Sequence, residues 1–209
     1  MVKMLSKTKV MLLAGMLVPI VFLGILTVLG YIQPGYSAIS DIGSHLENGQ
    51  NGWIMDLNFI VTGVLIVLFS FGFYKSLTNL IGHRTLKLAR VLLVVSGIGV
   101  LVGGIFIADP TNQPTTFHGM IHVGSFFFVI LPLITVAILI GLQLKKKSKW
   151  KALGNYSIVA GIGMLVLLAV FGYTVESNSE IIGFAQRVLL LWAFAWYFVF
   201  GLKFLNQDV

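Results

Sequence analysis

The sequence predicts an all-α, polytopic membrane protein: a bundle of six transmembrane helices that forms a single domain over residues 1–209. Hydrophobic residues make up 57% of the chain and charged residues 10%, and the mean hydropathy is +0.97. A water-soluble chain of this length could not cover so much apolar surface, so lipid must cover it. The apolar runs are about 20 residues long, as a membrane-spanning helix requires, and they lack the alternating pattern of a barrel strand.

Six apolar runs predict the helices in order, near residues 9–31, 53–74, 90–108, 118–141, 153–173 and 184–204. The first run contains Pro19 and is longer than the apolar part of a signal peptide, which favours an uncleaved helix. The third carries Gly99 and Gly103 with Ser96 one turn earlier, a pattern that lets a neighbouring helix approach closely. The fourth follows a loop with two prolines, and Thr115 or Thr116 can cap it.

The charged residues predict the orientation of the bundle. Thirteen of the fourteen Lys and Arg residues fall at the N-terminus, in the second and fourth connections and at the end of the sixth helix: Lys3, Lys7, Lys9, Lys75, Arg84, Lys87, Arg90, Lys145, Lys146, Lys147, Lys149, Lys151 and Lys203. By the positive-inside rule these segments are cytoplasmic, so both termini are inside a cell membrane. The net charge of +7 is explained by this topology, so we expect no nucleic-acid partner.

Six of the seven carboxylates and three of the four histidines fall on the other, outward-facing side. His118 and His122 are four residues apart, on one face of the fourth helix, and this spacing lets two imidazoles reach one divalent metal such as zinc. Asp109, or His45 or Asp41 in the first outer loop, would supply a third ligand. Asp56 and Asn58 are candidates for the surrounding shell, and Ser125 lies a further turn along the fourth helix.

Two alternatives stand beside the metal site. The polar residues can form a metal-free, hydrogen-bonded pocket, or the histidines can simply lie at the depth of the lipid headgroups. Arg187 is the one basic residue on the outer side. We expect it to pair with Glu176, Glu180 or Asp109, or to bind an anionic group of a ligand. Ser44 beside His45 is a poor nucleophile and base pair, because adjacent residues on a helix do not face one another.

Short motifs give the chain a resemblance to a family. These motifs are Ser40-Asp41-Ile42-Gly43-Ser44, Asp109-Pro110 followed by Thr115 and Gly119-Met120-Ile121-His122, and Gly183-Phe184-Ala185-Gln186-Arg187. With the six-helix layout, they resemble the DUF998 family of bacterial and archaeal membrane proteins without an assigned function. The resemblance implies that Asp41, Ser44, Asp109, His122 and Arg187 occupy the polar outer positions of that family.

Three functions remain open from the sequence. A membrane-embedded hydrolase would use a metal on His118, His122 and a carboxylate to activate water against a lipid-like substrate. A binding or transport protein would hold a small polar or lipid ligand from the outer leaflet, with Arg187 and Asp109 fixing its charge. A structural subunit would pack beside a larger membrane complex. The lipid bilayer is the one partner common to all three, and the oligomeric state is left open.

Overall fold

The structure, a computed structural model, describes residues 6–110 and 113–206. Lys3, one of the residues behind the orientation prediction, lies outside this range, as do Thr111 and Asn112 of the outer loop. The elements in order are α1 (Lys7–Ile32), the 3₁₀ helix η1 (Gly43–Asn48), α2 (Gly52–Leu77), α3 (His83–Ile105), α4 (Phe117–Lys145), the 3₁₀ turn η2 (Ser148–Trp150), α5 (Lys151–Glu176) and α6 (Ile182–Leu205). Six of the helices are long and apolar enough to cross a membrane, which confirms the predicted fold class.

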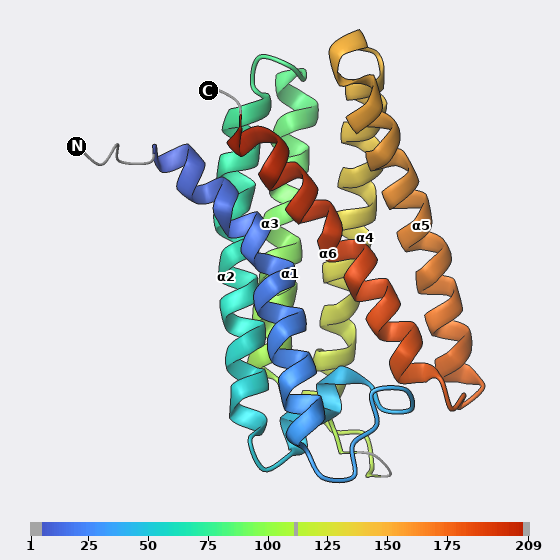
Figure 1. Cartoon of the computed structure of the whole chain (residues 1–209). Coiled ribbons are helices and arrows are strands. Elements are labelled where there is room, and N and C mark those ends of the chain that lie inside the picture. The colour runs from blue at the N-terminus through green and yellow to red at the C-terminus, as the bar shows by residue number, and fades with distance from the viewer. Residues whose placement is uncertain (1–5, 111–112, 207–209) are drawn as a thin grey trace.

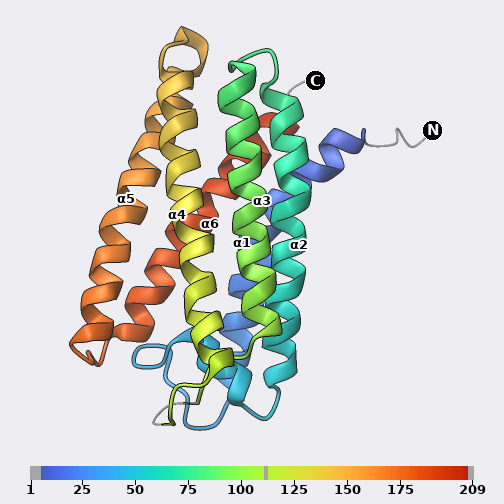
Figure 2. The ribbon, with the colours of Figure 1, turned by 180° about the vertical axis from the view of Figure 1, so that it is seen from behind.

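The helices form a ring in which each packs against the next along the chain, and α6 closes the ring against α1. Figures 1 and 2 show that α6 crosses the bundle obliquely, from the lower end of α5 to the upper ends of α1 and α2. The candidate site lies beside the first half of α6, where a cavity is lined by residues of all six helices.

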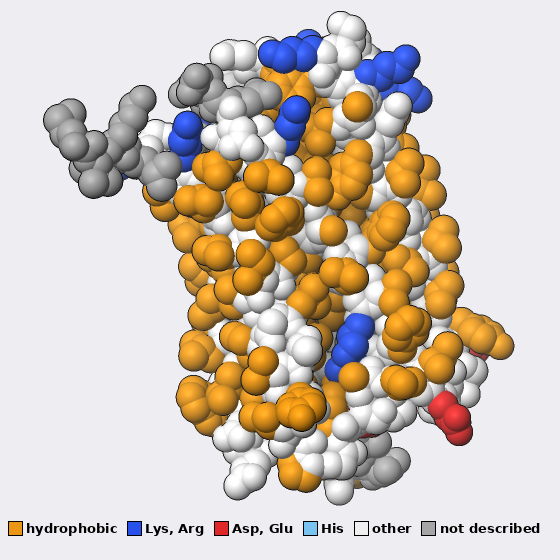
Figure 3. All heavy atoms as spheres, viewed as in Figure 1, with side chains coloured by type: hydrophobic (Ala, Val, Ile, Leu, Met, Phe, Trp, Pro, Cys, Tyr) orange, Lys and Arg blue, Asp and Glu red, His pale blue; other side chains and the backbone are white. Residues whose placement is uncertain are grey.

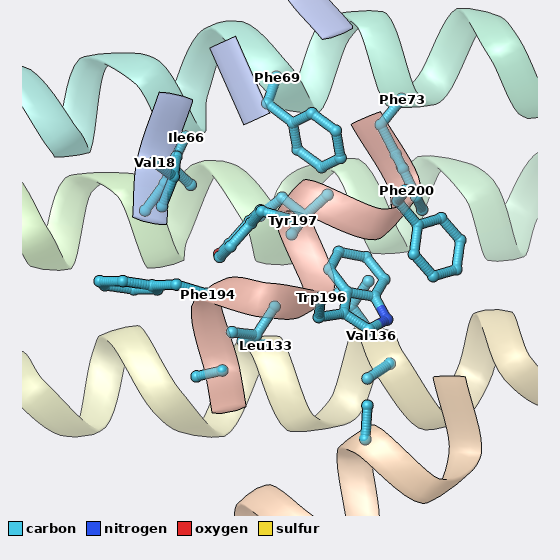
Figure 4. Close-up of a cluster of buried hydrophobic side chains, with 14 of the residues drawn as sticks. Val18, Ile66, Phe69, Phe73, Leu133, Val136, Phe194, Trp196, Tyr197 and Phe200 are labelled. Carbon is cyan, nitrogen blue, oxygen red and sulfur yellow. The ribbon is translucent and has the colours of Figure 1, made fainter. Parts of the chain in front are cut away.

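An aromatic cluster anchors the upper half of α6 (Figure 4). The ring centroids of Phe69 on α2 and Tyr197 on α6 lie 5.5 Å apart, and those of Trp196 and Phe200 lie 4.3 Å apart. Trp196 Nε1 also donates a hydrogen bond of 2.8 Å to Ser157 on α5, whose hydroxyl donates to the Ala137 carbonyl on α4 at 2.6 Å. Buried aromatic rings and satisfied polar groups together fix α6 at this end.

The small residues of α3 bring α4 close, as predicted. A Cβ added at Gly99 would lie 3.1 Å from the Ser125 carbonyl oxygen and from the Phe128 carbonyl carbon. Ser96 donates a hydrogen bond of 2.9 Å to the Val129 carbonyl of α4. The motif of Gly99 and Gly103 therefore serves packing within the bundle.

The boundaries of α3 differ most from the prediction, because it begins at His83 instead of residue 90 and ends at Ile105 instead of 108. The prediction followed the apolar run, whereas the helix continues through the basic turns around Arg84 and Lys87. At its other end Ala108 leaves the helical path, and its N–H donates to the side chain of Glu47 at 2.8 Å. A tertiary hydrogen bond thus replaces the last turn of the predicted helix.

The charged residues gather by sign at the two ends of the bundle. Figure 3 shows Lys and Arg side chains at the upper end and Asp or Glu at the lower end, with a further basic side chain in the lower half of this face. The start of α1 and the end of α6 both lie at the upper, basic end (Figure 1). This arrangement agrees with an even number of membrane passes.

We expect the basic end to be cytoplasmic, because Lys and Arg are retained on that side during membrane insertion. Reporters fused after Leu80 and after Ser148 should behave as cytoplasmic, and one fused after Asn178 as external. Green fluorescent protein and alkaline phosphatase fusions at the same three positions measure this. Active phosphatase at Leu80 or Ser148 would contradict the orientation.

Candidate functional site

The first outer loop closes the lower end of the bundle by docking on the start of α6 (Figure 1). Phe184 N–H donates to the Ile39 carbonyl at 2.9 Å, and Gly43 N–H donates to Gln186 Oε1 at 2.6 Å. Two of the motifs that carried the family resemblance therefore contact each other. The loop is bound to α6 although about 140 residues separate the two in the sequence, and it stands over the space between the helices.

Arg187 strengthens this docking. Its Nη1 donates to the carbonyls of Asp41 and Gly183, both at 3.0 Å, and its Nη2 donates to the Tyr36 hydroxyl. The guanidinium carbon lies 5.5 Å from the centroid of the Tyr36 ring. The expected ion pair with Glu176, Glu180 or Asp109 is not formed, because the loop backbone satisfies the guanidinium instead. Its positive charge is thus directed to the loop.

Thr116, one of the two threonines predicted to cap the fourth helix, caps it, and Asp109 binds this cap. Thr116 is the N-cap, and its hydroxyl accepts a hydrogen bond of 3.1 Å from Gly119 N–H. The Thr116 hydroxyl and N–H donate to the two carboxylate oxygens of Asp109 at 2.6 and 2.8 Å. A Cβ at residue 119 would lie 1.9 Å from Asp109 Oδ2, so this contact requires glycine. The bonds from Thr116 lower the pKa of Asp109, whose role here is structural.

His122 points its Nδ1 toward the end of α3. Nδ1 lies 2.9 Å from the carbonyl oxygens of Gly103 and Phe106, and 3.5 Å from Oε2 of Glu47. Carbonyl oxygens only accept hydrogen bonds, so Nδ1 carries a proton. His122 is buried, and Nε2 takes no partner in the described part of the chain. In the neutral ring Nε2 is therefore a free acceptor.

Glu47, which the sequence analysis did not single out as a site residue, lies directly behind His122. Its side chain is fully buried, Oε2 accepts the hydrogen bond from Ala108 N–H, and Oε1 has no hydrogen-bond partner. Burial raises the pKa of Glu47 to about 8, and the nearby charge of Asp56 acts in the same direction. A pKa of about 8 favours the protonated, neutral form of Glu47 at pH 7. The signal in the sequence was the spacing of Ser44 and Glu47, three apart, which places both on the buried face of η1.

The other residues predicted for the site lie around Glu47 and His122, but they do not form a single binding centre with them. Asn58 Nδ2 donates to the Phe22 carbonyl at 3.0 Å and fastens α2 to α1, while the Ser125 hydroxyl donates to the His122 carbonyl at 2.6 Å. Asp56 Oδ1 and Asn58 Oδ1 are buried and have no partner. His45 is half-buried on η1, and burial lowers its pKa.

The structure does not gather the predicted metal ligands. His118 is exposed, with its ring centroid 5.2 Å from that of Phe106, whereas His122 is buried and bonded to α3. Both carboxylate oxygens of Asp109 are engaged by Thr116. Within residues 6–110 and 113–206, no group of three or more His, Asp or Glu side chains is placed to hold a metal ion. His118 and His122 are four residues apart on α4, as the metal prediction required. Their surroundings differ, however, because His122 is buried and bonded to α3 while His118 is exposed.

A cavity of about 440 Å³ opens in front of His122, between the helices and under the first outer loop. Its walls are mainly apolar side chains from all six helices. The polar side chains that line it are Ser44, His122, Ser125, Glu176 and Gln186. In the described part of the chain, neither Lys nor Arg lines it. The cavity is thus mainly apolar, with hydroxyl, imidazole, amide and carboxylate groups among its few polar lining groups.

The cavity has a side opening between the outer halves of α4 and α5. Val123, Phe127 and Val175 line the cavity and are also exposed on the surface that faces lipid. Gly172 lines it too, and a Cβ added there would have no atom within 4 Å. Part of the cavity wall is therefore exposed on the lipid-facing side of α4 and α5.

Comparison with known proteins identifies a family and nothing more specific. Residues 16–203 match the family model described as "Protein of unknown function (DUF998)". No curated protein and no solved structure matches the chain. The match covers all the site residues discussed above, including Glu47 and His122.

Glu47 predicts how stability depends on pH. In the unfolded chain its carboxyl ionises near 4.5, but in the folded protein near 8, so ionisation opposes folding. The stability contributed by the protonated acid is complete below about pH 4.5 and is lost as the pH rises to about 8, by up to about 1.4 kcal/mol per pH unit. Thermal unfolding of the purified protein in detergent should show this loss.

Glu47→Gln keeps the shape of the side chain and removes the titration, so its unfolding temperature should vary much less between these pH values. Glu180→Gln, at an exposed carboxylate of the same end, is the matched control and should keep the wild-type profile. An unchanged pH profile in Glu47→Gln would show that Glu47 is already ionised in the folded protein.

Proposed function

Because the chain belongs to the DUF998 family, whose description assigns no activity, we propose its function from the geometry of the site. The protein is an integral membrane protein that binds a lipid-like amphiphile with an uncharged polar end. The apolar part of the ligand lies in the cavity between the helices. Its polar end lies beneath the first outer loop, beside His122.

The observation that carries this proposal is the composition of the cavity wall. A volume of about 440 Å³ falls within the range of about 300–1,000 Å³ that is typical of small-molecule sites. Most of the wall is apolar, and polar groups are few and gathered near one end. Such a site binds by burying apolar surface and orients the ligand through a few hydrogen bonds.

The polar groups favour a hydroxyl or another neutral group over a phosphate or a carboxylate. His122 Nε2 can accept a hydrogen bond, and Gln186 retains its amide donors, since only its Oε1 is engaged by Gly43. Arg187 is committed to the loop, and among the described residues the cavity is lined by the carboxylate of Glu176 but by neither Lys nor Arg, so an anionic group would meet no cation there. Burying an unpaired anion in this cavity would cost several kcal/mol, about the cost of any unpaired buried charge.

The proposal makes no use of catalysis by a metal. A hydrolase of the kind the sequence suggested requires His118, His122 and a carboxylate around one ion, and that arrangement has no support among the described side chains. The binding function requires only the cavity, its polar end and its side opening. It therefore depends on fewer assumptions than the enzymatic alternative.

Photo-cross-linking in vesicles tests the proposal. The probe is a long-chain alcohol that carries a diazirine near its far end, incorporated into vesicles of phosphatidylethanolamine and phosphatidylglycerol. We expect it to label cavity residues of α4 and α5 in the wild-type protein. The alkyl phosphate with the same chain should label them about tenfold less, which corresponds to about 1.4 kcal/mol of weaker binding.

Gly172→Phe fills open space at the cavity wall and should reduce labelling by the alcohol to background. Gly124→Phe is the matched control, because that glycine also has open space around it but does not line the cavity. Equal labelling of wild type and Gly172→Phe, or a preference for the alkyl phosphate, would overturn the proposal.

A further inference from the structure

We propose a second lipid site at the opposite, basic end of the bundle, where a groove between α5 and α6 binds an anionic phospholipid. This site shares no residue with the outer cavity, and it does not depend on the function proposed above. The groove combines apolar walls, a lysine at one end and basic surroundings.

The groove has a volume of about 370 Å³. Leu153 on α5 and Val199 and Leu202 on α6 form its apolar walls, and Lys203 and Asn206 form its polar end. Leu202 is 40% exposed, so the walls are continuous with the surface of the protein that faces lipid. An acyl chain can lie along the walls while the headgroup meets the ammonium and the amide at the end of α6.

Lys203 is held in place by aromatic packing. Its Nζ lies 5.9 Å from the centroid of the Trp150 ring. Trp150 is buried and stacks on Phe204 with a centroid distance of 5.1 Å and an interplanar angle of 14°. In the described part of the chain Lys203 forms no ion pair. The ammonium is therefore positioned at the groove and available to an anionic phosphate.

The surroundings of the groove are strongly basic. Five exposed lysines precede or begin α5, at positions Lys145, Lys146, Lys147, Lys149 and Lys151. Among the described residues of this end there is no Asp or Glu to offset them. Basic residues at the end of membrane-spanning helices attract anionic lipids, and the adjoining apolar walls favour a phospholipid over a soluble anion.

Native mass spectrometry of the detergent-solubilised full chain measures the binding. Phosphatidylglycerol should bind the wild type more tightly than phosphatidylcholine of the same chain length. Lys203→Gln should weaken phosphatidylglycerol binding about fivefold, the effect of about 1 kcal/mol for one lysine near the surface. Asn206→Asp, which adds a negative charge with little change of shape, should weaken it as well.

Lys87→Gln is the matched control, since Lys87 is exposed at the same end on α3 but outside the groove. It should leave the affinity for phosphatidylglycerol nearly unchanged. Equal losses in Lys203→Gln and Lys87→Gln would overturn the site, as would equal binding of the two lipids. Displacement of phosphatidylglycerol by millimolar inorganic phosphate would show that the apolar groove has no part in binding.

Gly172→Phe in the outer cavity should not change phosphatidylglycerol binding, because the two sites lie at opposite ends of the bundle. The failure of one proposal can thus be told apart from the failure of the other.

Discussion

The outer half of the structure depends on one buried carboxyl group, that of Glu47. Oε2 accepts the N–H of Ala108 at the point where α3 ends, and it lies 3.5 Å from His122 on α4. The same residue is in η1, directly before α2. One side chain therefore joins the outer loop, the end of α3 and the start of α4. A buried acid with few partners is stable only when it is protonated, so this junction couples the packing of the outer end to a neutral carboxyl group.

This junction also determines the character of the cavity. Nδ1 of His122 is hydrogen-bonded to the carbonyls of Gly103 and Phe106 at the end of α3. His122 also lines the cavity, and its Nε2 is the ring nitrogen that can accept a hydrogen bond. Arg187 likewise donates to backbone carbonyls, those of Asp41 and Gly183. Backbone carbonyls therefore orient both the imidazole of His122 and the guanidinium of Arg187. Among the described residues that line the cavity, the one carboxylate is Glu176 at the end of α5, and neither Lys nor Arg is present. For the ligand we propose, such a wall selects mainly by shape and hydrogen bonding and disfavours anions.

The six helices could be predicted from the sequence, because length and hydropathy of each run depend on local composition alone. So could the Thr116 cap and the contact of Gly99 with α4, since both follow local spacing. The role of Glu47 could not, because its partners Ala108 and His122 are 61 and 75 residues away and meet it only in the folded bundle. The spacing of His118 and His122 on one helical face likewise suggested that both bind one metal ion. The contact with α3, which involves only His122, could not be predicted because it forms between distant parts of the chain.

The protonation state of Glu47 tests the neutral junction between the outer loop, α3 and α4 most directly. Infrared difference spectroscopy of the reconstituted protein, compared with Glu47→Gln, isolates the C=O stretch of a protonated carboxylic acid. This band should be present in the wild type at pH 6, disappear as the pH rises past about 8 and be absent from the variant. A wild-type spectrum at pH 6 with only the bands of an ionised carboxylate would place a negative charge behind His122, and would contradict the neutral junction of the outer loop, α3 and α4.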